Sequence, residues 1–139
     1  PDRSPAARRG VHVEVHHSHR DALPATDLAW IAAAVRYRDL FSAGVHIYEN
    51  RHGEHSKIVL VDDEWVACGS YNFEDAAHDR LAEAMLASRD ERVVAPARAI
   101  FDGLRRDPDN EQVTPGVMDQ WPAWVWRRVA RYGRFKRWM

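Results

Sequence analysis

Four side chains able to bind or transfer a phosphate group lie in two closely spaced pairs in the middle of the sequence. His55 and Lys57 are two residues apart where a strand is expected to begin, and Ser70 and Asn72 are two apart just after the next expected strand. Side chains two apart on a strand point to the same face of a sheet. The polar sequence 62–64 suits a tight turn, so a hairpin would bring all four side chains to one end of two paired strands.

This combination of groups suits a phosphate diester. The ammonium of Lys57, the hydroxyl of Ser70 and the amide of Asn72 can donate hydrogen bonds to phosphate oxygens, and bonds from charged donors are the strong ones. The imidazole of His55 can attack phosphorus or protonate a leaving oxygen. Gly69 lacks a Cβ, which would let the backbone approach a ligand closely. The pattern therefore predicts a site for phosphodiester chemistry.

The spacing of these residues resembles the signature of the phospholipase D superfamily, often called the HKD motif. The match is His55-x-Lys57-x4-Asp62, followed by Gly-Ser-x-Asn at 69–72. Sequence on both sides of the motif resembles the C-terminal half of bacterial cardiolipin synthases, so that the resemblance covers roughly residues 2–106. The stretches that carry it are 8–11, 43–45 and 47–49.

The resemblance implies a two-step transfer through a phosphohistidine, with two half-sites facing each other. One histidine attacks phosphorus while the other serves first as general acid and then as base. The second half would be an upstream lobe of the same protein or the other chain of a homodimer. Lys57 and Asn72 would bind phosphate oxygens with Ser70 nearby, and Glu83 would orient the imidazole of His55. The family needs no metal and no cofactor.

Two features complicate the resemblance. Asp62 belongs to the motif and is therefore a candidate catalytic residue. It lies an odd number of residues from His55, so the two side chains would point to opposite faces of a strand, which favours a structural role for Asp62 in the turn. Glu74, Ala76-Ala77 and Leu81 stand where cardiolipin synthases usually carry Asp, Arg-Ser and Asn. These departures leave the core chemistry intact and bear on the choice of substrate within the family.

The pattern of apolar residues predicts an α/β fold, a phospholipase D-type half with a mixed β-sheet flanked by helices. Residues 81–87 fit either a strand or a helix. The other expected strands are 11–15, 45–48, 57–61 and 65–69, and the expected helices are 28–41 and 91–106, the second started or kinked by Pro96.

Composition divides the chain into a catalytic half-domain at 1–112, incomplete at its N-terminus, and a basic, Trp-rich tail at 113–139. The first part holds 14 Lys/Arg and 20 Asp/Glu, a net charge of −6, whereas the tail holds six Lys/Arg and only Asp119, a net charge of +5. No apolar run reaches the ~20 residues needed to span a bilayer. The opening Pro1, without Met or a signal pattern, predicts that the sequence is cut from a longer protein.

The tail has two competing interpretations. Its Trp and Tyr residues are of the kind that favours the membrane interface, and its Arg and Lys residues favour anionic headgroups. Alternatively, a C-terminal helix packs its tryptophans on the domain and leaves the arginines in water. Binding of nucleic acid is a third reading.

Other chemistry-bearing residues have plainer explanations. His16, His17 and His19 superficially resemble a metal site, but no further ligands occur at suitable spacing, which favours a solvated polar loop. Cys68 is expected to be a small buried residue and rules out an internal disulfide.

Three functions follow for testing. The first is a phosphatidyltransferase of the cardiolipin synthase type, acting on phospholipids at the bacterial cytoplasmic membrane, either peripherally or anchored by an upstream segment. The second is a phospholipase D-like nuclease or phospholipid hydrolase, although the acidic body argues against nucleic acid, which normally meets a basic surface. The third is a degenerate half that only supports a partner lobe, against which the intact motif argues.

Overall fold

The structure is a computed structural model that describes residues 5–22, 28–72 and 82–136. The chain forms two compact units, the first comprising residues 1–54 and 108–139 and the second residues 55–107. The first unit holds α1 (Pro5–Arg8), β1 (Glu14–Ser18), η1 (Arg20–Ala22), α2 (Leu28–Ala34), α3 (Tyr37–Ser42), β2 (His46–Asn50), β6 (Asn110–Val113), α6 (Pro115–Asp119) and α7 (Ala123–Lys136). The second holds β3 (Ile58–Val61), β4 (Trp65–Gly69), β5 (Met85–Ser88) and α5 (Glu91–Arg106).

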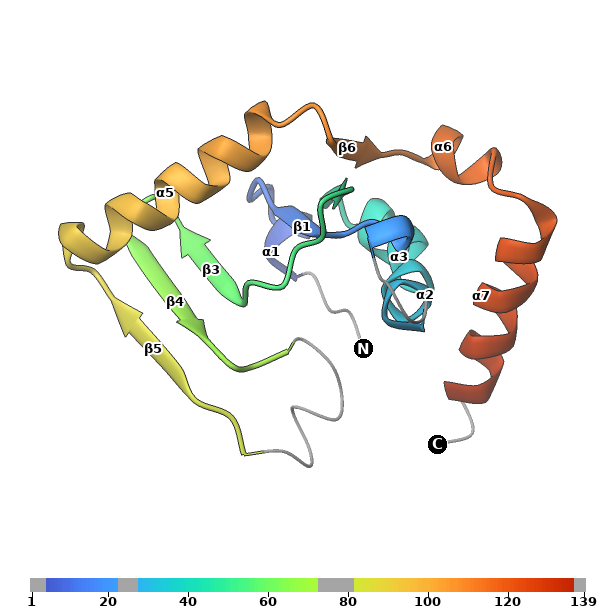
Figure 1. The fold of residues 1–139 in the computed structure, drawn as a ribbon, viewed down its shortest axis with the longest axis horizontal. Coiled ribbons are helices and arrows are strands. Elements are labelled where there is room, and N and C mark those ends of the chain that lie inside the picture. Colours follow the sequence, from blue (N-terminus) through green and yellow to red (C-terminus); the bar gives the residue numbers. More distant parts are fainter. Residues whose placement is uncertain (1–4, 23–27, 73–81, 137–139) are drawn as a thin grey trace. The chain divides into compact units, whose positions relative to one another are not determined.

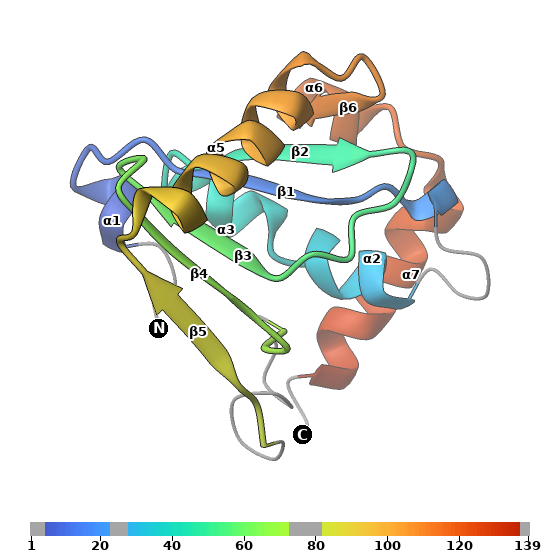
Figure 2. The ribbon, with the colours of Figure 1, turned by 60° about the vertical axis from the view of Figure 1, so that its left-hand side comes forward.

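The first unit is built on a three-stranded mixed sheet of order β1-β2-β6. β1 runs parallel to β2, and β6 runs antiparallel to β2 on its other side; β1 and β2 lie side by side in Figure 2. Apolar side chains from the sheet and from four helices form its core. The buried members are Trp30, Ile31, Ala34, Tyr37, Ala43, Val45, Ile47, Val113, Met118, Val125 and Val129.

A buried carboxylate ties the helices of this unit to the sheet. Glu49 on β2 is 5% exposed. One of its oxygens accepts a hydrogen bond from Trp30 Nε1 on α2 at 2.7 Å and another from the Tyr37 hydroxyl on α3. Burial, followed by the charge of Glu49, raises the pKa of Tyr37 well above its usual value. A buried carboxylate requires such donors, so β2, α2 and α3 are fixed together by polar as well as apolar contacts.

The first expected helix is divided in two, and the first expected strand is shifted along the sequence. The single helix predicted over 28–41 is divided into α2 and α3 at Val35-Arg36, where the N–H of Arg36 donates to Ala33 three residues back. The strand predicted at 11–15 lies instead at 14–18, because it pairs with β2 in the register Glu14↔His46 to Ser18↔Asn50.

His16 and His17 therefore lie on a strand, which corrects the prediction of a solvated loop. The His16 side chain is 2% exposed, stacks on Tyr48 with ring centroids 4.7 Å apart, and shares a 2.9 Å hydrogen bond with Asn110. His17 is hydrogen-bonded to the Tyr37 hydroxyl, and burial lowers its pKa. Both rings serve packing and hydrogen bonding in the sheet.

The tail predicted at 113–139 is part of the first unit. Its first residue, Val113, is the last residue of β6 and so belongs to the sheet, and Val125 and Val129 of α7 are 1% and 8% exposed. Trp121, Trp126 and Tyr132 pack against the same core, whereas Trp124 remains 45% exposed. The packing interpretation is correct for one face of α7. No helix among the described residues is long and apolar enough to cross a membrane.

The second unit is an antiparallel sheet of order β3-β4-β5 with α5 along one face (Figure 1). Residues 81–87, for which strand and helix both fitted, contribute to β5. Val94 and Ala97 of α5 pack against Val66 and the partly buried Ile58 and Leu60. The side chain of Asp90 caps α5 by accepting from the N–H of Arg92 at 2.9 Å, and α5 continues past Pro96 to Arg106.

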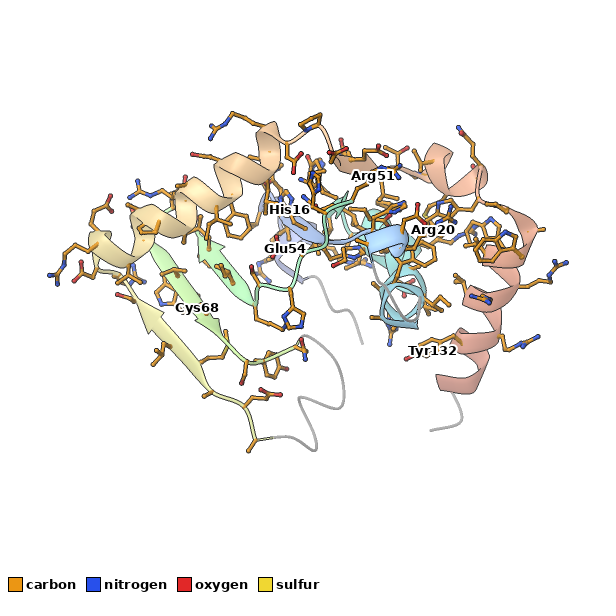
Figure 3. The ribbon with its side chains drawn as sticks, viewed as in Figure 1. His16, Arg20, Arg51, Glu54, Cys68 and Tyr132 are labelled. Carbon is orange, nitrogen blue, oxygen red and sulfur yellow. The ribbon has the colours of Figure 1, made fainter. Side chains whose placement is uncertain are left out.

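The expectation that Cys68 is buried is wrong, because its side chain is exposed on β4 (Figure 3). Cys68 pairs with Ile58 on one side and with Leu86, which is 80% exposed, on the other. The buried contacts of α5 are centred on Val66, two residues earlier on the strand. Residues near the end of β4 therefore lie beyond the cover of α5.

The hairpin between β3 and β4 has the expected turn. Asp62 and Asp63 adopt positive φ values of 52° and 55°, and the N–H of Glu64 donates to the carbonyl of Val61 at 3.0 Å. Consecutive left-handed residues match the twist of antiparallel strands, and Asp tolerates this conformation better than most residues. The turn sets the register Val61↔Trp65 through Ile58↔Cys68.

Gly69 is required by the approach of β5 rather than by a ligand. A Cβ at this position would lie 2.0 Å from the carbonyl oxygen of Ala84 and 2.9 Å from Cα of Met85. Both obstacles are backbone atoms, which cannot move aside without shifting the strand. The absence of a side chain thus allows β4 and β5 to pair up to Gly69↔Met85.

We predict that Gly69→Ala lowers the free energy of unfolding by about 1–3 kcal/mol, the usual cost of overpacking. Gly103→Ala is the matched control, because a Cβ on this α5 glycine meets nothing within 4 Å. Alanine is favoured over glycine in a helix, so the control should raise stability by about 0.5–1 kcal/mol. Urea denaturation of both variants measures the two effects. Equal stabilities would show that the β4–β5 approach is not a constraint.

Candidate functional site

The predicted phosphate-handling residues line one hollow of about 360 Å³ in the second unit. It lies at the end of the β3–β4 hairpin opposite the 62–64 turn, because its lining precedes β3 and follows β4. The lining residues are His55, Ser56, Lys57, Gly69, Ser70 and Asn72. The structure thus brings together the two pairs that the spacing predicted, and adds Ser56, which was not among the predicted residues.

The end of the hairpin is closed by backbone and side-chain bonds of Lys57. The N–H of Gly69 donates to the carbonyl of Lys57 at 3.2 Å, which extends the ladder past β3. Lys57 Nζ donates to the carbonyl of His55 at 2.7 Å, so its ammonium lies beside the histidine. His55 and Asn72 are exposed and Lys57 is half-buried. An oxyanion entering the hollow would meet a lining that includes both Lys57 and His55.

Ser70 occupies a fixed position between two strands. Its hydroxyl donates to the carboxylate of Glu83 and accepts a hydrogen bond from the N–H of Ala84 at 3.1 Å. The N–H of Ser70 donates to the carbonyl of Ala84 at 3.0 Å. These two hydrogen bonds between Ser70 and Ala84 depend on the close approach of the backbone at 84–85 to Gly69. Sequence reasoning placed Ser70 near the phosphate but did not predict its contact with Glu83.

Glu83 borders the hollow through Ser70. Its contact in this structure is the Ser70 hydroxyl, and its role in orienting His55 stays a prediction. Its carboxylate can polarise the Ser70 hydroxyl. Because the Ser70 hydroxyl already donates to this carboxylate, the remaining protons of the Lys57 ammonium and the amide of Asn72 are the donors that we expect to reach phosphate.

Asp62 lies at the other end of the hairpin. It is exposed at the left-handed turn and is not among the residues that line the hollow. This position agrees with the structural role that its strand parity favoured. Glu74, Ala76-Ala77 and Leu81, the departures from the cardiolipin synthase pattern, lie outside the described residues.

The charge of the hollow suits a phosphate diester. Among the described residues that line it, Lys57 is the one with a permanent charge, and a diester carries one negative charge. The amide of Asn72 and the ammonium supply donors, and the imidazole of His55 supplies a nucleophile or proton donor.

The fold and the site define the class of protein. Residues 3–105 match the family described as "Cardiolipin synthase, PLD-like domain", which covers more than half of the chain. The chain therefore belongs to this family of phospholipase D-like domains, as its motif indicated.

Curated relatives are cardiolipin synthases of bacteria. The chain is 29% identical to cardiolipin synthase B of Salmonella typhi over 120 residues, 86% of this chain and 28% of that protein. It is 28% identical to cardiolipin synthase B of Escherichia coli K12 over 100 residues, 71% of this chain and 24% of that protein. The chain thus spans about a quarter of the length of these relatives.

A solved structure supports the fold. The phospholipase D family member Nuc from Salmonella typhimurium superposes with a TM-score of 0.58 at 20% identity, covering 76% of this chain and 66% of that one. The α/β phospholipase D fold expected from the sequence is confirmed. In the described part of this chain the strands form one mixed and one antiparallel sheet of three strands each.

We predict that Lys57→Ala raises the dissociation constant of the chain for orthovanadate on the order of tenfold, because a hydrogen bond to a charged group contributes about 1.5–3 kcal/mol. Titration followed by the NMR signals of the His55 ring measures this. Arg89→Ala removes one positive charge from an exposed position of the same unit, outside the hollow, and should change the constant little. Similar losses in both variants would mean that general charge, not the site, attracts the anion.

Proposed function

We propose that this chain is one half of a phospholipase D-type phosphodiesterase that transfers a phosphatidyl group through a phosphohistidine. The observation that carries the proposal is the convergence of His55, Lys57, Ser70 and Asn72 on one hollow inside the segment that matches the family. A nucleophile or proton donor, one balancing charge and neutral donors are the groups that phosphodiester transfer requires.

The proposed reaction has two steps. A ring nitrogen of one histidine attacks phosphorus, and the bond from phosphorus to the leaving alcohol oxygen breaks while the second histidine gives that oxygen a proton. The second histidine then takes the proton of an incoming alcohol, whose oxygen attacks phosphorus and breaks the phosphorus–nitrogen bond. His55 is one of these two histidines, as nucleophile or as general acid. Lys57 and Asn72 bind the phosphate oxygens, where negative charge develops in the transition state.

The proposed substrates are phospholipids. With the hydroxyl of a second phospholipid as acceptor the product is a cardiolipin-type lipid, and with water as acceptor the same site is a hydrolase. The relatives named cardiolipin synthase B support the first alternative. Nucleic acid is the alternative substrate, which would make the protein a nuclease. The net charge of −6 over residues 1–112 argues against this alternative.

The second histidine comes from another half of the same type. Among the described residues that line the hollow, His55 is the single histidine, and the two-step scheme uses two. The chain corresponds to about a quarter of its relatives, so an upstream lobe of the parent protein can supply the second half. A homodimer of this half is the alternative. We place the assembly at the bacterial cytoplasmic membrane, where its substrates are.

His55→Ala in the parent protein should abolish turnover of a phospholipid substrate while leaving its thermal stability unchanged, because His55 is exposed. Loss of a nucleophile or general acid costs on the order of 10²–10⁴-fold or more in rate. Product formation followed by chromatography of labelled lipid measures it, with His12→Ala, an exposed histidine elsewhere, as control. Near-normal turnover by a folded His55→Ala protein would refute the catalytic assignment.

The isolated chain should be inactive as a monomer, because one half-site supplies one histidine. Turnover of a soluble phosphodiester, measured with sedimentation at the same concentration, tests this. Activity that falls with the square of dilution would indicate the homodimer. Activity proportional to the concentration of a verified monomer would contradict the two-histidine scheme.

A further inference from the structure

Helix α7 of the basic tail is amphipathic, with one face packed against the core of the first unit and the other exposed. Val125, Val129 and Tyr132, at helical spacing, pack into the core of the first unit. The opposite face presents exposed side chains at the same spacing and defines what we call the arginine face. Its members are Trp124, Arg127, Arg128 and Arg131, and α7 contains no acidic residue.

Packing on the domain does not account for the arginine face. Arg131 lies four residues from Arg127 and three from Arg128, so these like charges repel one another along the helix. Trp124 is 45% exposed although the neighbouring Val125 is 1% exposed. Like charges at this spacing destabilise a helix, and an anionic partner would relieve the repulsion.

Trp124 is held between two guanidinium groups. Cζ of Arg20, from η1, lies 5.6 Å from the ring centroid, and Cζ of Arg128 lies 5.4 Å from it; Figure 3 labels Arg20. Such cation–π contacts fix the orientation of an exposed ring. Asp21 lies 3.4 Å from Arg20 Nε and partly balances its charge. Arg20 therefore orders the ring, and Arg127 and Arg131 lie on the same exposed face of α7.

We propose that the arginine face docks α7 flat on an anionic phospholipid bilayer, with Trp124 at the level of the headgroups. Arginine side chains bind headgroup phosphates, and tryptophan favours the membrane interface, where its ring is partly apolar and partly wet. The face extends along α7 and combines an exposed tryptophan with side chains of positive charge. This inference rests on the proposed function for its biological setting, and it names the surface and the lipid charge that the enzyme uses.

The test is co-sedimentation of the full 139-residue chain with vesicles of phosphatidylcholine mixed with phosphatidylglycerol. The double variant Arg127→Gln/Arg131→Gln should lower the partition coefficient about fivefold for each arginine, about 25-fold for the pair. Trp124→Ala should weaken binding and make the remainder more sensitive to salt, because apolar burial is not screened. The matched control is Arg105→Gln/Arg106→Gln, which removes two exposed arginines at the end of α5 and should leave binding unchanged.

Several results would overturn the proposal. They are equal losses in the arginine-face and control variants, equal binding to pure phosphatidylcholine vesicles, and tighter binding to an oligonucleotide than to the anionic vesicles. Thermal melting separates loss of docking from misfolding, since removal of repelling, exposed arginines should not lower Tm.

The docking proposal and the proposed chemistry can be refuted independently of each other. Vesicle binding does not use His55, so a His55→Ala chain should bind vesicles as the unchanged chain does. Turnover of a soluble phosphodiester by the parent, combined with absence of vesicle binding, would refute the docking face alone. Vesicle binding by the chain, combined with full activity of the His55→Ala parent, would refute the proposed function alone.

Discussion

The close approach of β5 to Gly69 is the constraint on which the candidate site depends. Because position 69 has no side chain, the carbonyl of Ala84 reaches the N–H of Ser70, and the N–H of Ala84 reaches the Ser70 hydroxyl. These bonds fix the chain where it leaves β4, opposite the residues that lead into β3. The turn at Asp62-Asp63 sets the register from the other end of the hairpin. Together they hold two loop segments, each carrying reactive side chains, against one hollow.

The sequence predicted the hairpin well because its signals are local. Strands expected at 57–61 and 65–69 are observed at 58–61 and 65–69, and the polar turn and the helix at 91–106 are where they were expected. Alternation along two paired strands was sufficient to predict that His55, Lys57, Ser70 and Asn72 converge. The same rule missed Ser56, because the backbone at 53–57 is not strand and side chains there need not alternate.

Structural features that depend on contacts between residues far apart in the sequence could not be predicted from local patterns. His16 and His17 look like members of a polar loop, yet pairing with β2 and contacts with Asn110 and Tyr37 make them strand residues. The exposure of Cys68 depends on how far α5 extends over the sheet. The tail divides its side chains between the core and an exposed basic face, which composition alone could not reveal.

A crystal structure of the chain with bound tungstate tests the central claim most directly, since that oxyanion mimics the phosphate of a diester. The account predicts the anion in the hollow, with Lys57 Nζ and the Asn72 amide donating to its oxygens and a ring nitrogen of His55 facing the central atom. An anion bound by arginines elsewhere, with the hollow empty at saturating tungstate, would contradict the assignment of this hollow as a phosphodiester half-site.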